Sequence, residues 1–70
     1  MTADASPLER LVLDALAGAT AYLRTRDVAR AADLAPTVAY TVLRRLQGRR
    51  MVTGRRTIPG QLAMAWRVAA

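Results

Sequence analysis

The chain has 70 residues and a net charge of +6, and it contains neither cysteine nor histidine. A chain of this length buries only about 60% of the surface that it exposes when unfolded, so we expect one small domain. Without cysteine it has no disulfide and no thiolate metal site, and without histidine it lacks the commonest metal ligand and general base. We therefore expect no metal and no cofactor.

The groups needed for catalysis and for membrane insertion are also missing. Ser6 is the only serine, lysine is absent, and all five carboxylate side chains lie within residues 1–33, so nothing activates a nucleophile. No stretch approaches the roughly 18 to 20 apolar residues that span a bilayer. The sequence predicts a cytoplasmic protein that is not an enzyme, with no membrane partner and no evident small-molecule ligand.

The charge is divided unevenly between the two halves of the chain. Residues 1–33 contain four arginines against five carboxylates, a net −1, whereas residues 34–70 contain seven arginines and no carboxylate side chain, a net +7. A one-sided charge of this kind is typical of a surface that binds a polyanion. Arginine also suits that role, because its planar guanidinium pairs with phosphate or guanine through two hydrogen bonds.

The first predicted helix, residues 7–17, opens with a capping box. Ser6 is the N-cap, Pro7 takes the first helical position, and Glu9 follows the cap by three residues. Gly18 ends the helix. The apolar residues that recur at helical spacing are Leu8, Leu11, Val12, Ala15 and Leu16.

A short strand and a second helix follow. Residues 21–24 predict a brief extended segment able to pair as an edge strand. Thr25 is expected to cap a helix that runs through residues 26–33, and Asp33 is expected to adopt the left-handed conformation that often ends a helix. The predicted inner face of this helix carries Val28, Ala31 and Ala32.

The third predicted helix, residues 36–47, starts at Pro36 and carries two stripes at helical spacing. The stripes lie about half a turn apart, so one is expected in the core and the other in solvent. The core stripe is Ala39, Val42, Leu43 and Leu46. The exposed stripe is Thr37, Tyr40, Thr41 and Arg44.

The last part of the chain changes to short extended runs, which predict a β-hairpin. Residues 51–56 form the expected first strand, residues 57–61 a turn around a Pro-Gly pair, and residues 62–68 the second strand. Alternation predicts one buried face on the second strand, made of Leu62, Met64, Trp66 and Val68. Trp66 is expected to close the core, and residues 1–5 to be disordered.

This element order predicts an α+β fold, mainly α, and is that of a winged helix-turn-helix domain over residues 6–70. Residues 24–52, RTRDVARAADLAPTVAYTVLRRLQGRRMV, resemble the helix-turn-helix and first wing strand of bacterial winged-helix regulators of the MarR and PadR kind. The family usually has glycine at the position of Arg50. We therefore expect the turn into the wing to be built around Gly48.

The resemblance implies a protein that binds double-stranded DNA, with the third helix in the major groove and the wing on the backbone or in the minor groove. By position, the implied recognition residues are Thr37, Val38, Tyr40, Thr41 and Arg44, and the acid-free charge of the second half of the chain adds Arg45 to them. The basic residues expected at the backbone, from their charge and their place at the wing, are Arg49, Arg55 and Arg56. The expected role is that of a small transcriptional regulator associated with the nucleoid. A homodimer on DNA is expected too, because one domain of this size rarely gives enough specificity alone.

One alternative from a different functional class stays open. The same arginines could serve a winged-helix protein-interaction module that binds an acidic partner. Two plainer roles also remain: Arg44 and Arg45 as a solvated helix face, and Arg55 and Arg56 as charges that keep a sheet edge from pairing. Binding to random duplex DNA that weakens steeply with salt would favour the DNA hypothesis.

Overall fold

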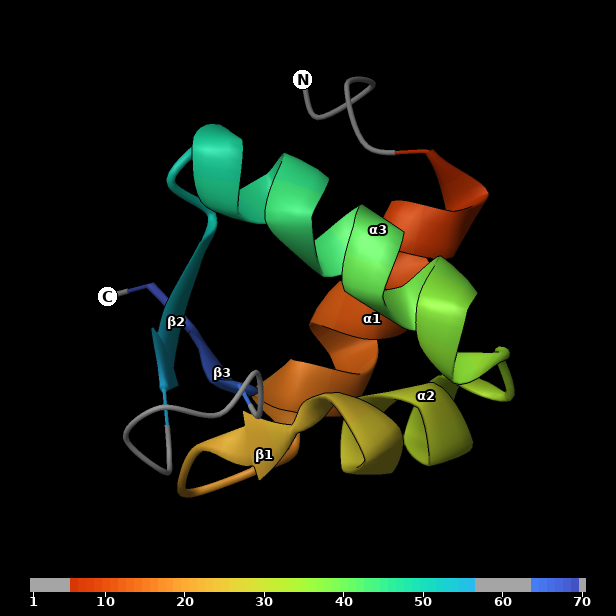
Figure 1. Cartoon of the computed structure of the whole chain (residues 1–70), viewed down its shortest axis with the longest axis horizontal. Coiled ribbons are helices and arrows are strands. Elements are labelled where there is room, and N and C mark those ends of the chain that lie inside the picture. Colours follow the sequence, from red (N-terminus) through yellow and green to blue (C-terminus); the bar gives the residue numbers. More distant parts are fainter. Residues whose placement is uncertain (1–5, 57–63, 70) are drawn as a thin grey trace.

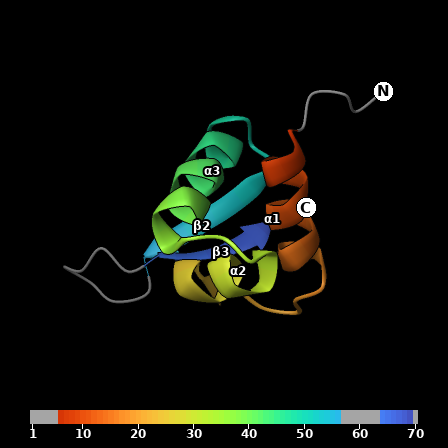
Figure 2. The same ribbon diagram turned by 90° about the vertical axis from the view of Figure 1, so that its right-hand side faces the viewer.

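The computed structural model describes residues 6–56 and 64–69 and has an α+β fold that is mainly helical. Figure 1 shows α3 lying across α1, with the strands gathered at one end, and Figure 2 shows α1 and α3 side by side above α2. The elements are α1 (Pro7–Ala17), β1 (Leu23–Arg24), α2 (Thr25–Ala32), α3 (Pro36–Gly48), β2 (Val52–Arg56) and β3 (Met64–Val68). The predicted order of elements is confirmed.

Three predictions lie outside the described residues: the disorder of residues 1–5, the turn at residues 57–61, and the burial of Leu62. Within residues 6–56 and 64–69, every helix is too short or too polar to cross a bilayer.

The start of α1 is the capping box that the sequence predicts. The Glu9 backbone N–H donates to the Ser6 hydroxyl at 3.2 Å, and the Ser6 N–H donates to the Glu9 carboxylate at 2.9 Å. These two bonds satisfy backbone donors that a helix start leaves without partners. Pro7 occupies the first helical position as expected.

The buried side of α1 is turned away from two of the predicted apolar positions. Leu8 and Leu11 are 41% and 46% exposed, whereas Glu9 is only 2% exposed. Glu9 tolerates burial because an Arg49 guanidinium nitrogen lies 3.2 Å from its carboxylate. The large apolar side chains that α1 does bury are Val12 and Leu16.

The prediction that Thr25 caps α2 is wrong. Thr25 is the first residue of the helix, and the N-cap, Arg24, makes no side-chain capping bond. The Thr25 hydroxyl instead accepts a hydrogen bond of 2.8 Å from the indole N–H of Trp66. Trp66 is fully buried, so its donor needs a partner within the fold. A long-range contact has therefore displaced the local one.

The rest of α2 agrees with the prediction, except that Ala29 is buried in place of Ala31. Asp33 has a φ of 58° and ends the helix in the left-handed region, as predicted. Ala31 is exposed, contrary to the prediction, because it points away from the apolar side of this short helix. The residues that α2 buries are Val28, Ala29 and Ala32.

Both predicted stripes of α3 are confirmed. The helix starts at Pro36 and includes Gly48, one residue more than predicted. The buried stripe is Ala39, Val42, Leu43 and Leu46. The exposed stripe is Thr37, Tyr40, Thr41 and Arg44.

The turn after α3 is built around Arg50 rather than around Gly48, so that prediction is wrong. Arg50 has a φ of 62°, the left-handed conformation in which glycine is common. The N–H groups of Arg50 and Met51 donate to the carbonyls of Gln47 and Leu46, both at 3.0 Å. These two bonds are the Schellman pattern of helix ends, and they fix the left-handed residue at position 50.

The three strands form one antiparallel sheet in the order β1-β3-β2. Trp66 of the central strand is fully buried, as predicted, and is paired with Gly54 of β2. A Cβ atom at Gly54 would lie 2.6 Å from the Trp66 ring, so the indole occupies the space that a side chain would need. The core cluster formed around this contact includes residues of α1, α2, α3 and β2.

The predicted alternation of burial on β3 holds at Trp66 and fails on either side of it. Val68 is 37% exposed, because it lies at the strand end beyond the reach of β1. Ala65 is buried although it was expected to face outward. It is paired with Arg24 on one side and Arg55 on the other, and the stems of long side chains can cover a small residue between them.

Candidate nucleic-acid interface

The exposed face of α3 brings together the six side chains predicted for recognition: Thr37, Val38, Tyr40, Thr41, Arg44 and Arg45. At about 100° per residue, Thr37, Thr41 and Arg44 lie along its middle. Tyr40 lies on the side toward β3, and Val38 on the side toward α1. The Thr41 hydroxyl donates to the Thr37 carbonyl at 3.0 Å, which leaves its oxygen available as an acceptor.

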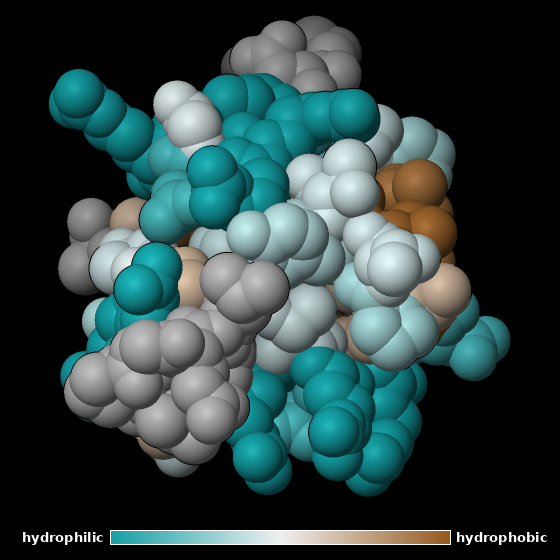
Figure 3. All heavy atoms as spheres, in the orientation of Figure 1, coloured by the Kyte–Doolittle hydropathy of each residue, from teal (hydrophilic) through white to brown (hydrophobic). Residues whose placement is uncertain are grey.

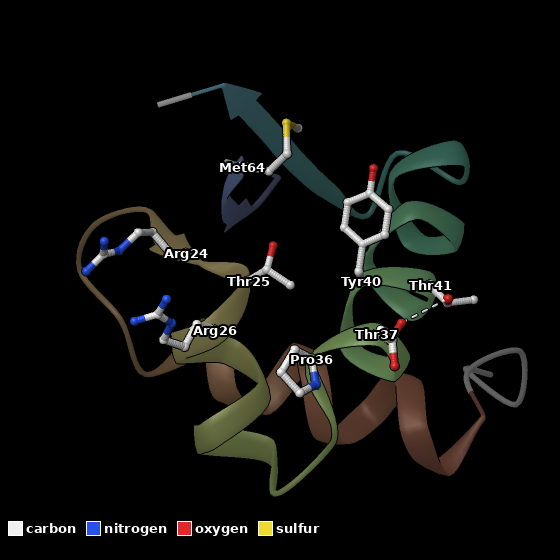
Figure 4. Close-up of a pocket in the computed structure, with 8 residues that line it drawn as sticks. All are labelled: Arg24, Thr25, Arg26, Pro36, Thr37, Tyr40, Thr41 and Met64. Atoms are coloured by element: carbon white, nitrogen blue, oxygen red, sulfur yellow. Dashed lines mark hydrogen bonds between the residues drawn. The ribbon is translucent and has the colours of Figure 1, made fainter. Parts of the chain in front are cut away.

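An open cleft of about 680 Å³ lies between the start of α2, the first half of α3 and β3. Figure 4 shows Tyr40 on one side of this cleft, with Arg24 and Arg26 on the opposite side. The lining residues are Arg24, Thr25, Arg26, Pro36, Thr37, Tyr40, Thr41 and Met64. We call this the α2–α3 cleft. Its walls combine three threonines with Pro36, Tyr40 and Met64, and its far rim is basic.

Arg24 and Arg26 are residues that sequence reasoning missed. They fall in the half of the chain whose net charge is negative, so the charge count gave no reason to select them. Arg24 lies 3.7 Å from Asp27, whereas Arg26 forms no ion pair with another described residue. Their one sequence signal is their place on either side of Thr25 at a helix start, where backbone N–H groups favour an anion.

A smaller cleft of about 280 Å³ lies on the other side of α3, against α1. Its lining residues are Leu8, Thr37, Val38, Thr41, Val42 and Arg45. Thr37 and Thr41 border both clefts, so they form the ridge between them. The face of α3 is thus a raised strip with a hollow on each side.

A series of contacts joins this strip to the core. The Trp66 indole, held by Thr25, meets the Tyr40 ring edge-on, with ring centroids 6.2 Å apart and planes at 70°. The Tyr40 hydroxyl accepts a hydrogen bond of 3.3 Å from Arg44. Tyr40 is 39% exposed, as predicted, yet one edge of it is packed. Arg44 is therefore oriented by an aromatic side chain that rests on the core.

The two predicted arginines of β2 lie on opposite faces of the sheet. Arg56 is paired with Met64, and directly paired residues share a face, so Arg56 lies on the face that borders the α2–α3 cleft. Arg55 lies on the other face, with its guanidinium carbon 4.9 Å from the centre of the Tyr22 ring. The sequence grouped these two residues, and the structure separates them.

Arg49, the third predicted backbone contact, lies against a buried carboxylate. Its guanidinium donates to both oxygens of Glu9, at 3.2 and 3.3 Å. The Ser6 backbone N–H lowers the pKa of Glu9 most, burial works against it, and the charge and hydrogen bonds of Arg49 lower it further. The carboxylate is therefore ionised and neutralises Arg49 locally. Sequence reasoning missed this pair, because its members are 40 residues apart.

Among the residues that the structure describes, no carboxylate lines either cleft. In Figure 3, hydrophilic side chains gather over the C-terminal half of α3 and again over α2. Among residues 6–56 and 64–69, no three metal-ligating side chains lie together. The chemistry available at this surface is hydrogen bonding by hydroxyl groups and the attraction of anions by arginine.

Comparison with protein-family models, with curated proteins and with solved structures finds no match for this chain.

Proposed function

We propose that the chain is a winged helix-turn-helix protein that binds double-stranded DNA, with α3 in the major groove and the β2–β3 wing against the backbone. The observation that carries the proposal is the exposed strip of α3, where hydroxyl groups and Arg44 lie between basic edges and no described carboxylate lines either side. A helix in the major groove needs this arrangement, with base-reading groups in the middle and phosphate-binding groups on the flanks.

The proposal places the backbone contacts along the α2–α3 cleft. Arg26 lines this cleft and Arg56 lies on the sheet face that borders it, and we assign both to phosphates. Arg45 lies on the opposite side of α3, in the smaller cleft with Leu8 of α1, and is not assigned to a phosphate. Arg49 is left out, because Glu9 already neutralises it. A small regulator that acts by occupying its site needs no further chemistry.

Arg44 should act mainly on base selection. Its contact with Tyr40 directs it along the exposed strip, and a bidentate contact to guanine discriminates by about 1 to 3 kcal/mol. We expect Arg44→Ala to relax preference at one position of sites selected from a random library. Arg10→Ala is the matched control, because it removes one exposed arginine on α1, away from both clefts. If both variants select the wild-type site unchanged, α3 does not read bases through Arg44.

Arg55 and Arg56 form a matched pair within the wing, since they are adjacent and equal in charge. We expect Arg56→Ala to weaken specific and random duplexes by similar factors and to flatten the salt slope of binding by about 0.9. We expect Arg55→Ala to change the slope much less, because its guanidinium lies on Tyr22 on the other face. Titrations at several salt concentrations measure both slopes. Equal loss from the two variants would contradict the assigned face.

The protein-interaction alternative predicts a different set of results. A module that binds an acidic partner should bind random duplex DNA no better than it binds an acidic polypeptide of equal charge density. A DNA-binding protein should prefer the duplex to the polypeptide. It should also prefer some duplex sequences to others, and this second preference should depend on Thr37 and Thr41, which carry no charge. We expect the Thr37→Val and Thr41→Val variants to lose preference among duplexes while keeping the salt slope of the wild type.

A further inference from the structure

One exposed apolar patch lies beside the strip of α3 that is assigned to base reading. It consists of Leu8 and Leu11 on α1 and the adjoining Val38 on α3, which are 41%, 46% and 39% exposed. Figure 3 shows apolar atoms gathered over the first turns of α1 beside the start of α3. The smaller cleft, lined by Leu8 and Val38, continues the patch into the molecule. We call these three residues the α1 patch.

The α1 patch is not explained by the fold. The apolar spacing of α1 would allow both leucines to face the core, yet that side is occupied by Val12, Leu16 and the buried Glu9. Leu11 is the most exposed large apolar residue described. An apolar patch with a charged rim is typical of a protein contact surface.

The two edges of the patch carry opposite charges. Arg45 borders Leu8 on the α3 side, in the smaller cleft. Asp14 lies one turn after Leu11 on α1, on the side away from α3 by the helical spacing, and both charged residues are exposed. A patch with a positive edge and a negative edge can match a second copy of itself, because a twofold axis can bring each edge opposite its complement.

We propose that the α1 patch is the contact between two copies of this chain on adjacent DNA sites, with a twofold axis near Leu11. This inference rests on the proposed function. Three residues cover far less than the roughly 800 Å² per partner of a stable interface, so the copies remain separate in free solution. DNA raises their local concentration, and the small patch then suffices to make binding cooperative. The position of the patch beside α3 lets the neighbour sit on the same duplex.

Cooperativity on DNA of two lengths tests the proposal without knowledge of the target sequence. Half-sites are spaced by about 10 bp, so a random duplex of about 12 bp holds one copy and one of about 40 bp holds several. We expect simple binding to the short duplex and cooperative binding to the long one, by a factor of about 5 to 150. Leu11→Gln should abolish the cooperativity and keep the affinity for the short duplex. Val68→Gln, at an exposed valine of β3, is the control and should change neither.

A cross-linking experiment locates the contact. Because the chain has no cysteine, Leu11→Cys and Val68→Cys each introduce a single thiol. A disulfide requires Cα atoms within about 7 Å, which a twofold axis at position 11 supplies. We expect mild oxidation to give a covalent dimer of Leu11→Cys on the long duplex and little of it on the short one or without DNA. Val68→Cys should remain monomeric under all three conditions.

The outcomes separate this inference from the proposed function. If neither duplex is bound, both fail. If the short duplex is bound and the long one is bound without cooperativity, the DNA proposal survives and the patch proposal is overturned. Cooperativity that persists in Leu11→Gln, or equal cross-linking at position 68, overturns it as well. A non-cooperative protein whose Leu11→Gln variant melts at lower temperature would assign the patch to the chain's own fold and also overturn the proposal.

Discussion

Arg44 of α3 and Arg49, the residue that follows its last turn, are held in different ways. Past the C-terminal end, Arg49 donates to the buried carboxylate of Glu9. On the exposed strip, Arg44 donates to the neutral hydroxyl of Tyr40, and no described carboxylate lies within ion-pair distance of it. The first charge is neutralised within the fold, and the second remains available to a ligand. The role of each arginine is therefore decided by its partner, which lies four residues away for Arg44 and 40 residues away for Arg49.

The largest expected effect is the difference in stability between the alanine variants of these two arginines. Arg49→Ala leaves the buried Glu9 carboxylate without its counter-charge, and we expect the free energy of unfolding to fall by about 2 to 3 kcal/mol. Arg44→Ala removes an exposed side chain and should change it by less than about 0.5 kcal/mol. Thermal and urea unfolding measure both. Equal effects would mean that the two arginines do not differ in structural role.

The hydrogen bond that holds Trp66 against Tyr40, the partner of Arg44, can be tested at Thr25. Thr25→Val removes the hydroxyl that accepts from the buried indole of Trp66 and keeps the shape of the side chain. An unsatisfied buried donor costs about 1 to 2 kcal/mol, so we expect a loss of that size in the free energy of unfolding. Thr53→Val, at an exposed threonine of β2, is the control. If the two variants unfold alike, Trp66 does not depend on this acceptor.

Residues with local signals could be placed from the sequence. The capping box at Ser6, the left-handed Asp33 and the two stripes of α3 depend on spacings of a few residues, and all are present. Two of the features that were missed have a common cause in contacts between distant parts of the chain. Trp66 takes the hydroxyl of Thr25 from 41 residues away, and Arg49 takes Glu9 from 40. Spacing within one helix cannot reveal such partners.

The candidate site follows the same rule. The exposed face of α3 was predictable, because helical periodicity alone separates it from the core stripe. The division of Arg55 from Arg56 was not, because it depends on the register between β2 and β3. The basic rim formed by Arg24 and Arg26 was not predictable either, since it becomes part of a cleft only when α2 packs beside α3.

Acid should weaken the fold through Glu9 of α1, whose carboxylate is paired with Arg49. The pKa of Glu9 is held below its ordinary value of 4.5, first by the Ser6 N–H and then by Arg49. A lowered folded-state pKa stabilises the fold above the ordinary value, and this contribution is lost as the pH falls through the folded-state pKa. We expect Glu9→Gln to lose about 1 kcal/mol at neutral pH and to approach the wild type below pH 4.5.

The measurement for this prediction is the free energy of unfolding as a function of pH for both proteins. Asp14→Asn is the control, because it removes an exposed carboxylate from the same helix. A gap between wild type and Glu9→Gln that stays constant from neutral to acid pH would mean that the Glu9 carboxylate contributes no pH-dependent stability.

The smallest expected effect is a gain in the free energy of unfolding, from a substitution at Arg50. Arg50 adopts a φ of 62°, which costs an L-residue about 1 to 2 kcal/mol, and the two hydrogen bonds of the helix end hold it there. Glycine relieves this cost but loses more backbone entropy on folding, so we expect Arg50→Gly to raise the free energy of unfolding by about 0.5 to 1 kcal/mol. Arg50→Ala removes the same charge and keeps the Cβ atom, so it should give no gain. If alanine stabilises the protein as much as glycine does, the benefit comes from reduced repulsion among the arginines at this end of α3, and the backbone conformation of Arg50 carries no cost of its own.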